Sequence, residues 1–136
     1  MNKEILWLRI SYWVGAIVDG FAAVQMLFPE LYTLTNSTNF TPGAEFGYAM
    51  RSGAPLMVGW TVLLIWADRK PVERKGVLLI VIPVVVGVAL NQITAIPIGV
   101  SSVGATIPIW ILQAALISLF TFSYLNARDA SPMDDD

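Results

Sequence analysis

The sequence contains no cysteine and no histidine among its 136 residues. Without cysteine the chain can form no disulfide and has no thiol nucleophile, and zinc or haem sites that need either residue are excluded. Histidine is also the usual proton carrier near neutral pH. We therefore expect no metal, no cofactor and no catalytic residue, and an enzyme is the least favoured class of function.

Charge is scarce as well. Only 13% of the residues are charged and 56% are apolar, whereas soluble domains carry about 25% charged residues. The net charge is −2 and no basic stripe is present, which argues against a nucleic-acid partner. Four stretches are long and apolar enough to cross a bilayer, and they lie at about residues 5–28, 45–67, 76–98 and 106–125.

These stretches predict an all-α membrane protein. We expect one four-helix up-down domain over residues 1–125, in which the first and second spans pair, as do the third and fourth. An acidic flexible tail is expected at residues 126–136. A short interfacial helix is expected around Glu30–Leu34. The triplets that begin at Asn36 and Asn39 match glycosylation acceptors, but a hydrogen-bonded turn segment is the favoured interpretation and their modification stays open.

The orientation follows from the connection at residues 68–75. It holds half of all lysines and arginines, namely Arg69, Lys70, Arg74 and Lys75. Under the positive-inside rule this connection is cytoplasmic, and so are both termini. The sequence thus predicts a multi-pass protein of the inner (plasma) membrane of a prokaryotic cell, with Arg51 as the one basic residue that departs from the rule.

Each predicted span carries a strongly polar residue. Asp19 lies in the first span, and an ionised carboxylate in a bilayer costs about 2.5–3.5 kcal/mol on insertion scales. At about 1.5 Å per residue, all of these residues fall roughly 9–13 Å from the outer ends of their spans: Asp19, Arg51, Asn91, Gln92 and Gln113. We expect an Asp19–Arg51 ion pair in this layer, with the three amides completing its hydrogen bonds.

Three functions are compatible with such a layer. The first is a protein that binds a lipid or a small molecule in a polar pocket in the outer half, or a transporter component; the arginine would favour an anionic ligand. The second is an accessory or assembly protein whose polar network is purely structural. The third is an intramembrane enzyme with Asp19 as base and Arg51 as electrostatic stabiliser. The bilayer is the expected partner, and small-residue patterns fit either contacts within the bundle or a homo-oligomer.

The segment MRSGAPLMVGWTVLLIWADRKPVERKGVLL, Met50 to Leu79, and the pattern LRISYWVGAIVDG, Leu8 to Gly20, cover roughly half of the chain. They resemble a group of small, uncharacterised prokaryotic membrane proteins with four spans. The general plan is also similar to that of DoxX-type four-helix membrane proteins. These resemblances imply the fold and its membrane location, and no motif carries a function or a site residue over.

Overall fold

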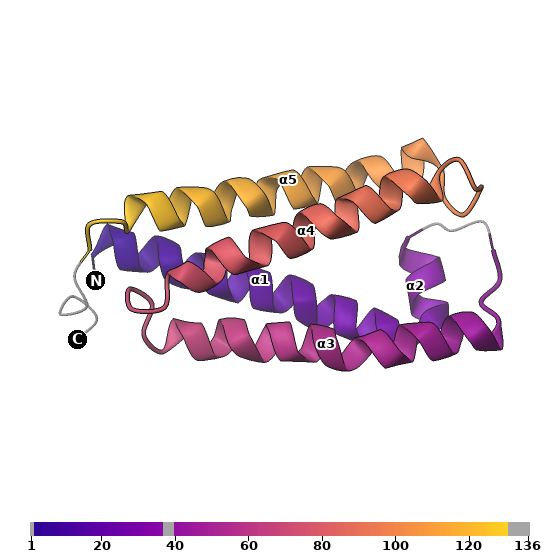
Figure 1. The fold of residues 1–136 in the computed structure, drawn as a ribbon, viewed down its shortest axis with the longest axis horizontal. Coiled ribbons are helices and arrows are strands. Elements are labelled where there is room, and N and C mark those ends of the chain that lie inside the picture. Colours follow the sequence, from indigo (N-terminus) through magenta and orange to yellow (C-terminus); the bar gives the residue numbers. More distant parts are fainter. Residues whose placement is uncertain (1, 37–39, 131–136) are drawn as a thin grey trace.

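The computed structural model of the protein describes residues 2–36 and 40–130, and these residues form helices joined by turns, without strands. The predicted all-helical class is therefore confirmed. Five helices follow one another along the described chain (Figure 1), namely α1 (Lys3–Leu27), α2 (Pro29–Thr35), α3 (Ala44–Asp68), α4 (Gly76–Ala95) and α5 (Val103–Asn126).

Local sequence explains where the helices begin and end. Pro29 opens α2 at the first helical position, where its missing N–H costs nothing, and this short helix was expected. The hydroxyl of Ser102 accepts a hydrogen bond from the amide of Ala105 and so caps the start of α5. Helix α4 ends at Ala95 rather than at residue 98, and the chain then turns through Gly99, whose φ of 77° favours glycine.

The four long helices form two hairpins, as expected. Helix α1 packs along α3, and α4 packs along α5, while the hairpins meet mainly through α1 and α5. Figure 1 shows that the start of α1 and the end of α5 lie together, beside the turn between α3 and α4. We call this the terminus end, and the opposite end, where α2 lies, the α2 end.

The hydrophobic core lies toward the terminus end. Its fully buried members include Leu8 and Tyr12 of α1, Leu64 of α3 and Phe120 of α5. Helix α4 contributes buried side chains only near its start, Leu78 and Val81. Toward the α2 end, α4 buries none, so the two hairpins are packed together more closely at the terminus end.

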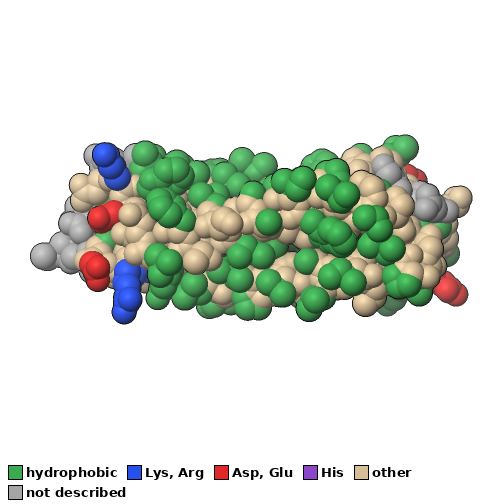
Figure 2. Space-filling model, turned by 90° about the horizontal axis from the view of Figure 1, so that it is seen from above, with side chains coloured by type: hydrophobic (Ala, Val, Ile, Leu, Met, Phe, Trp, Pro, Cys, Tyr) green, Lys and Arg blue, Asp and Glu red, His purple; other side chains and the backbone are tan. Residues whose placement is uncertain are grey.

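Three of the described helices are long and apolar enough to cross a membrane: α1, α4 and α5. Helix α3 is as long as α1, with 25 residues, but it is not among the three. On the face shown in Figure 2, charged side chains are confined to the two ends and apolar side chains cover the middle. These features indicate a membrane protein.

The predicted tail starts with an anchored segment. Ala127 is fully buried, and the ammonium group of Lys75 donates to the carbonyls of Ala127 and Arg128 at 2.6 and 2.8 Å. The rest of the predicted tail, residues 131–136, lies outside the described residues, as does Asn39 of the second glycosylation-type triplet. Asn36, the first residue of the other triplet, donates from its side chain to the carbonyl of Tyr32 at 3.0 Å.

Candidate functional site

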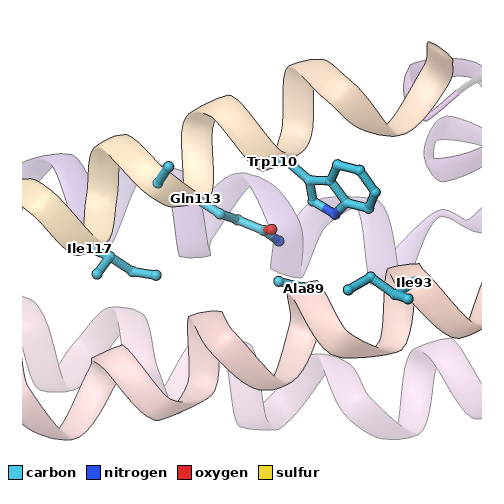
Figure 3. Close-up of a pocket in the computed structure, with 6 residues that line it drawn as sticks. Ala89, Ile93, Trp110, Gln113 and Ile117 are labelled. Atoms are coloured by element: carbon cyan, nitrogen blue, oxygen red, sulfur yellow. The ribbon is translucent and has the colours of Figure 1, made fainter. Parts of the chain in front are cut away.

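A cavity of about 250 Å³ lies between α4 and α5. Figure 3 shows Trp110 and Gln113 extending from α5 toward α4, where Ala89 and Ile93 face them. The spacing of the α5 residues explains this placement, because positions 110, 113 and 117 share one face of a helix. Gln113 is only 8% exposed, although its amide is one of the most polar groups in α5.

Three buried polar atoms of the described residues in this region have no hydrogen-bond partner. They are the amide oxygens of Gln92 and Gln113 and the indole nitrogen of Trp110. A buried polar group without a partner costs about 1–3 kcal/mol, so such groups in a native structure call for an explanation. Gln113 and Trp110 line the cavity, whereas Gln92 is not among its lining residues, so the Gln113 oxygen and the Trp110 N–H are the groups that a small polar ligand there would satisfy.

Asp19 lies on the side of α1 that faces the other helices. A Cβ atom added at Gly15, one turn earlier, would lie 2.9 Å from Leu64 of α3 and 3.0 Å from Phe120 of α5. Residues four apart share a helix face, so Asp19 is directed toward the same junction, one turn closer to the α2 end. It is partly buried. Among the described residues it makes no hydrogen bond and no ion pair.

The heights of Asp19 and Gln113 are similar. Because Gly15 lies opposite Phe120 and the two helices run in opposite directions, Asp19 is level with Leu116. Gln113 is three residues beyond Leu116, or about 4.5 Å farther toward the α2 end. Gln92 is next to Ile93, which faces Trp110 across the cavity. Counted in this way, Asp19, Gln92 and Gln113 lie at neighbouring heights along the bundle.

Arg51 does not belong to this group, and the predicted Asp19–Arg51 ion pair is not formed. Gly20 lies against Thr61, since a Cβ atom there would be 3.7 Å from the Thr61 methyl. Asp19 is thus level with Thr61, whereas Arg51 lies ten residues away along α3, about 15 Å. The guanidinium of Arg51 instead folds over Gly47, close to the first turn of α2: a Cβ at Gly47 would lie 3.0 Å from Arg51 Nη2 and 3.7 Å from Pro29 Cγ.

The reason for this separation is that α3 extends beyond α1. The chain forms α2 after α1, and Tyr32 of α2 contacts Phe46 near the start of α3, with ring centroids 5.9 Å apart. The first two turns of α3 therefore lie beside α2, past the end of α1. A depth counted from the first residue of α3 places Arg51 too far inside.

Asn91 also lies outside the site. Its side chain is exposed, and only its backbone carbonyl takes part in a side-chain hydrogen bond, from Thr94 at 2.8 Å. Neighbouring helix positions point about 100° apart, so Gln92 can face the interior while Asn91 faces outward. Trp110 is the residue that the polar-layer argument missed. Trp110 could have been found from the sequence, because it precedes Gln113 by three residues and so shares its helix face.

A second, shallow surface depression lies along α3 and is lined by Gly59, Val62, Leu63 and Trp66. These four residues offer apolar surface and no unpartnered buried polar atom. The α4–α5 cavity is the better candidate site, because specific binding needs a few polar groups in an apolar surrounding.

Comparisons of the chain with protein-family models, with curated proteins and with solved structures gave no match.

Proposed function

We propose that this protein binds a lipid or a small molecule between its helices, as a binding protein or a component of a transporter. The observation that carries the proposal is the amide oxygen of Gln113, which is buried beside the α4–α5 cavity without a hydrogen-bond partner. A ligand with a polar group at this point would remove the penalty of that burial.

The accessory role is the competing proposal. It requires the polar side chains to hold the helices together by bonding to one another. The amides of Gln92 and Gln113 each leave an oxygen unpaired, and Asp19 has no described partner. These groups contribute little as connections between helices, and this favours a binding role.

We further propose that α3 also spans the membrane, which makes four spans with both termini in the cytoplasm. Helix α3 runs beside α1, and its middle exposes apolar side chains such as Leu56, Val62 and Ile65, as a lipid-facing helix would. The basic residues at 69–75 fix the cytoplasmic side under the positive-inside rule. The inner (plasma) membrane of a prokaryotic cell is the proposed location. We also propose that the protein is related to the small four-span membrane proteins that its sequence resembles.

Native mass spectrometry of the gently extracted protein tests the binding role. We expect a bound lipid or solute on the wild type and its loss from Gln113→Leu, while Asn91→Leu, on the exposed side of α4, retains it. A protein that carries no ligand in the wild type, or an equal amount in both variants, would contradict the proposal.

The absence of cysteine makes the orientation easy to test. Single cysteines at Lys70 and Thr41, both exposed, can be labelled in intact cells with a membrane-impermeant maleimide. Labelling of Thr41→Cys without Lys70→Cys supports four spans with cytoplasmic termini. Equal labelling of both positions from outside, or of neither, would refute this topology.

A further inference from the structure

The charged group at about the height of the candidate site is Asp19, on the inward side of α1, and no described lysine or arginine pairs with it. Arg51 is about 15 Å away along α3, and Arg9, ten residues earlier in α1, is also about 15 Å away. Arg9 in any case lies 3.8 Å from Asp68, at the terminus end. The carboxylate therefore stands without a cation of its own in the apolar part of the molecule.

The unpartnered oxygen atoms near Asp19 could also accept from a cationic ligand. The oxygens of Gln92 and Gln113 are acceptors, and an ionised carboxylate only accepts. Trp110 adds an aromatic wall to the cavity, and tryptophan is the ring that attracts organic cations most strongly. The indole N–H of Trp110 and the amide N–H groups of the glutamines are donors, so the charge preference of this region depends on the unpaired carboxylate of Asp19.

We propose that the seat formed by Asp19, Gln113 and Trp110 takes an organic ammonium ion, with Asp19 as its counter-ion. This rests on the proposed binding function and reverses the charge that the sequence indicated, since an anion would need Arg51 in the site. The ammonium group would be held by the Asp19 carboxylate and the Gln113 oxygen, and its apolar part would occupy the cavity between α4 and α5 (Figure 3). A lipid headgroup amine and a free amine share this chemistry.

Isothermal titration calorimetry of the full chain in dodecyl maltoside, with protein-free micelles as the blank, tests the charge preference. The probes are benzyltrimethylammonium, benzyl alcohol and benzenesulfonate, which share one aromatic ring and differ in charge. We expect the cation to bind about tenfold or more tightly than the other two. Equal binding of all three, or preference for benzenesulfonate, would overturn the cation seat and leave the proposed binding function standing. Binding of none, with no co-purified lipid, would overturn both.

Substitutions locate the seat. Asp19→Asn is expected to weaken binding of benzyltrimethylammonium about tenfold or more, while Arg51→Gln, Glu45→Gln and Asn91→Leu leave it unchanged. If Asp19→Asn does not fold, the probe series on the wild type still decides the charge preference. Unchanged affinity in a folded Asp19→Asn protein would refute the role of this carboxylate.

Nanodiscs distinguish the two sources of the amine. If the seat takes a lipid headgroup, benzyltrimethylammonium binds in phosphatidylglycerol nanodiscs and is displaced when phosphatidylethanolamine is included. If the seat takes a free cation, the two nanodiscs give the same affinity. Either result supports a cation seat, whereas no binding in both kinds of nanodisc contradicts it.

Discussion

The hydroxyl of Ser11 in α1 donates a hydrogen bond of 2.7 Å to the hydroxyl of Ser123 in α5, and both side chains are fully buried. The Ser123 hydroxyl in turn donates to the carbonyl of Trp7 at 3.2 Å. These two hydrogen bonds join the two hairpins at the terminus end, where most of the buried core residues also lie.

Ser123→Ala is expected to destabilise the protein by about 1 kcal/mol, because it removes the partner of the buried Ser11 hydroxyl and an additional bond to the Trp7 carbonyl. Ser11→Ala should cost less, since Ser123 keeps its bond to Trp7. The measurement is reversible unfolding in mixed dodecyl sulfate and dodecyl maltoside micelles. Ser118→Ala is the control, because that exposed hydroxyl bonds only within its own helix, to Ala114. A cost as large for Ser118→Ala would show that the inter-helix bond contributes nothing.

The side chains of Leu64 in α3 and Phe120 in α5 fill the space beside Gly15 in α1. A Cβ atom at this position would lie 2.9 Å from Leu64 and 3.0 Å from Phe120, which is too close for ordinary packing. Gly15→Ala should therefore destabilise the protein by about 1–3 kcal/mol, the usual cost of overpacking a core. Gly87→Ala, in α4 with open space around it, should be neutral or stabilising, since alanine favours helices by up to about 1 kcal/mol. Similar effects of the two substitutions on unfolding would contradict this packing.

Gln113→Leu is expected to stabilise the ligand-free protein. The substitution replaces an unpartnered buried amide by an apolar group of similar size, and it should recover about 1 kcal/mol of the burial penalty. The test is the unfolding midpoint after exhaustive delipidation in detergent. A purely structural role for Gln113 predicts the opposite sign, so a clear loss of stability in the delipidated variant would count against a ligand site.

Glu73 lies in the turn between α3 and α4 and should titrate at low pH. Lys70 bonds its carboxylate at 2.8 Å and holds the pKa of Glu73 below its ordinary value of 4.5. Because the pKa is lowered in the folded protein, the stabilising contribution is present above pH 4.5 and is lost as the pH falls through the folded pKa. The pair is exposed, so its contribution to stability is small.

The check is an NMR titration of the Glu73 carboxyl carbon. Lys70→Met should move the pKa of Glu73 back toward 4.5, although not fully, because Arg74 also lowers it. An unchanged midpoint in Lys70→Met would show that this ion pair does not persist in solution.

Much of the helical framework could be predicted from the sequence. Long, mostly apolar runs, interrupted at Pro29, at the basic turn and at Gly99, leave little choice of helix limits. The heights of Asp19, Gln92 and Gln113 could also be estimated, because each is counted along a helix of fixed rise from a boundary that the sequence marks well.

The remaining features depend on how helices are placed side by side. The height of Arg51 depends on the extension of α3 past α1, and no residue near Arg51 signals that extension. The choice between Asn91 and Gln92 depends on the rotation of α4. This helix is apolar on all sides, so its sequence gives no inward face. The cation preference follows only when the distance between Asp19 and Arg51 is known.

The two bonds from Lys75 to the carbonyls of Ala127 and Arg128, just after α5, have a mechanical consequence. Lys75 immediately precedes α4, so these bonds, of 2.6 and 2.8 Å, hold the start of α4 to the segment after α5. The chain enters the α4–α5 hairpin from α3 at the same point, which therefore forms a pivot between the two hairpins at the terminus end. Each hairpin extends from this pivot as an arm of about 30 Å, the length of a 20-residue helix. A rotation of about 5° at this pivot would shift the far end of one hairpin relative to the other by about 2.6 Å on such an arm, while the core at the terminus end stays packed.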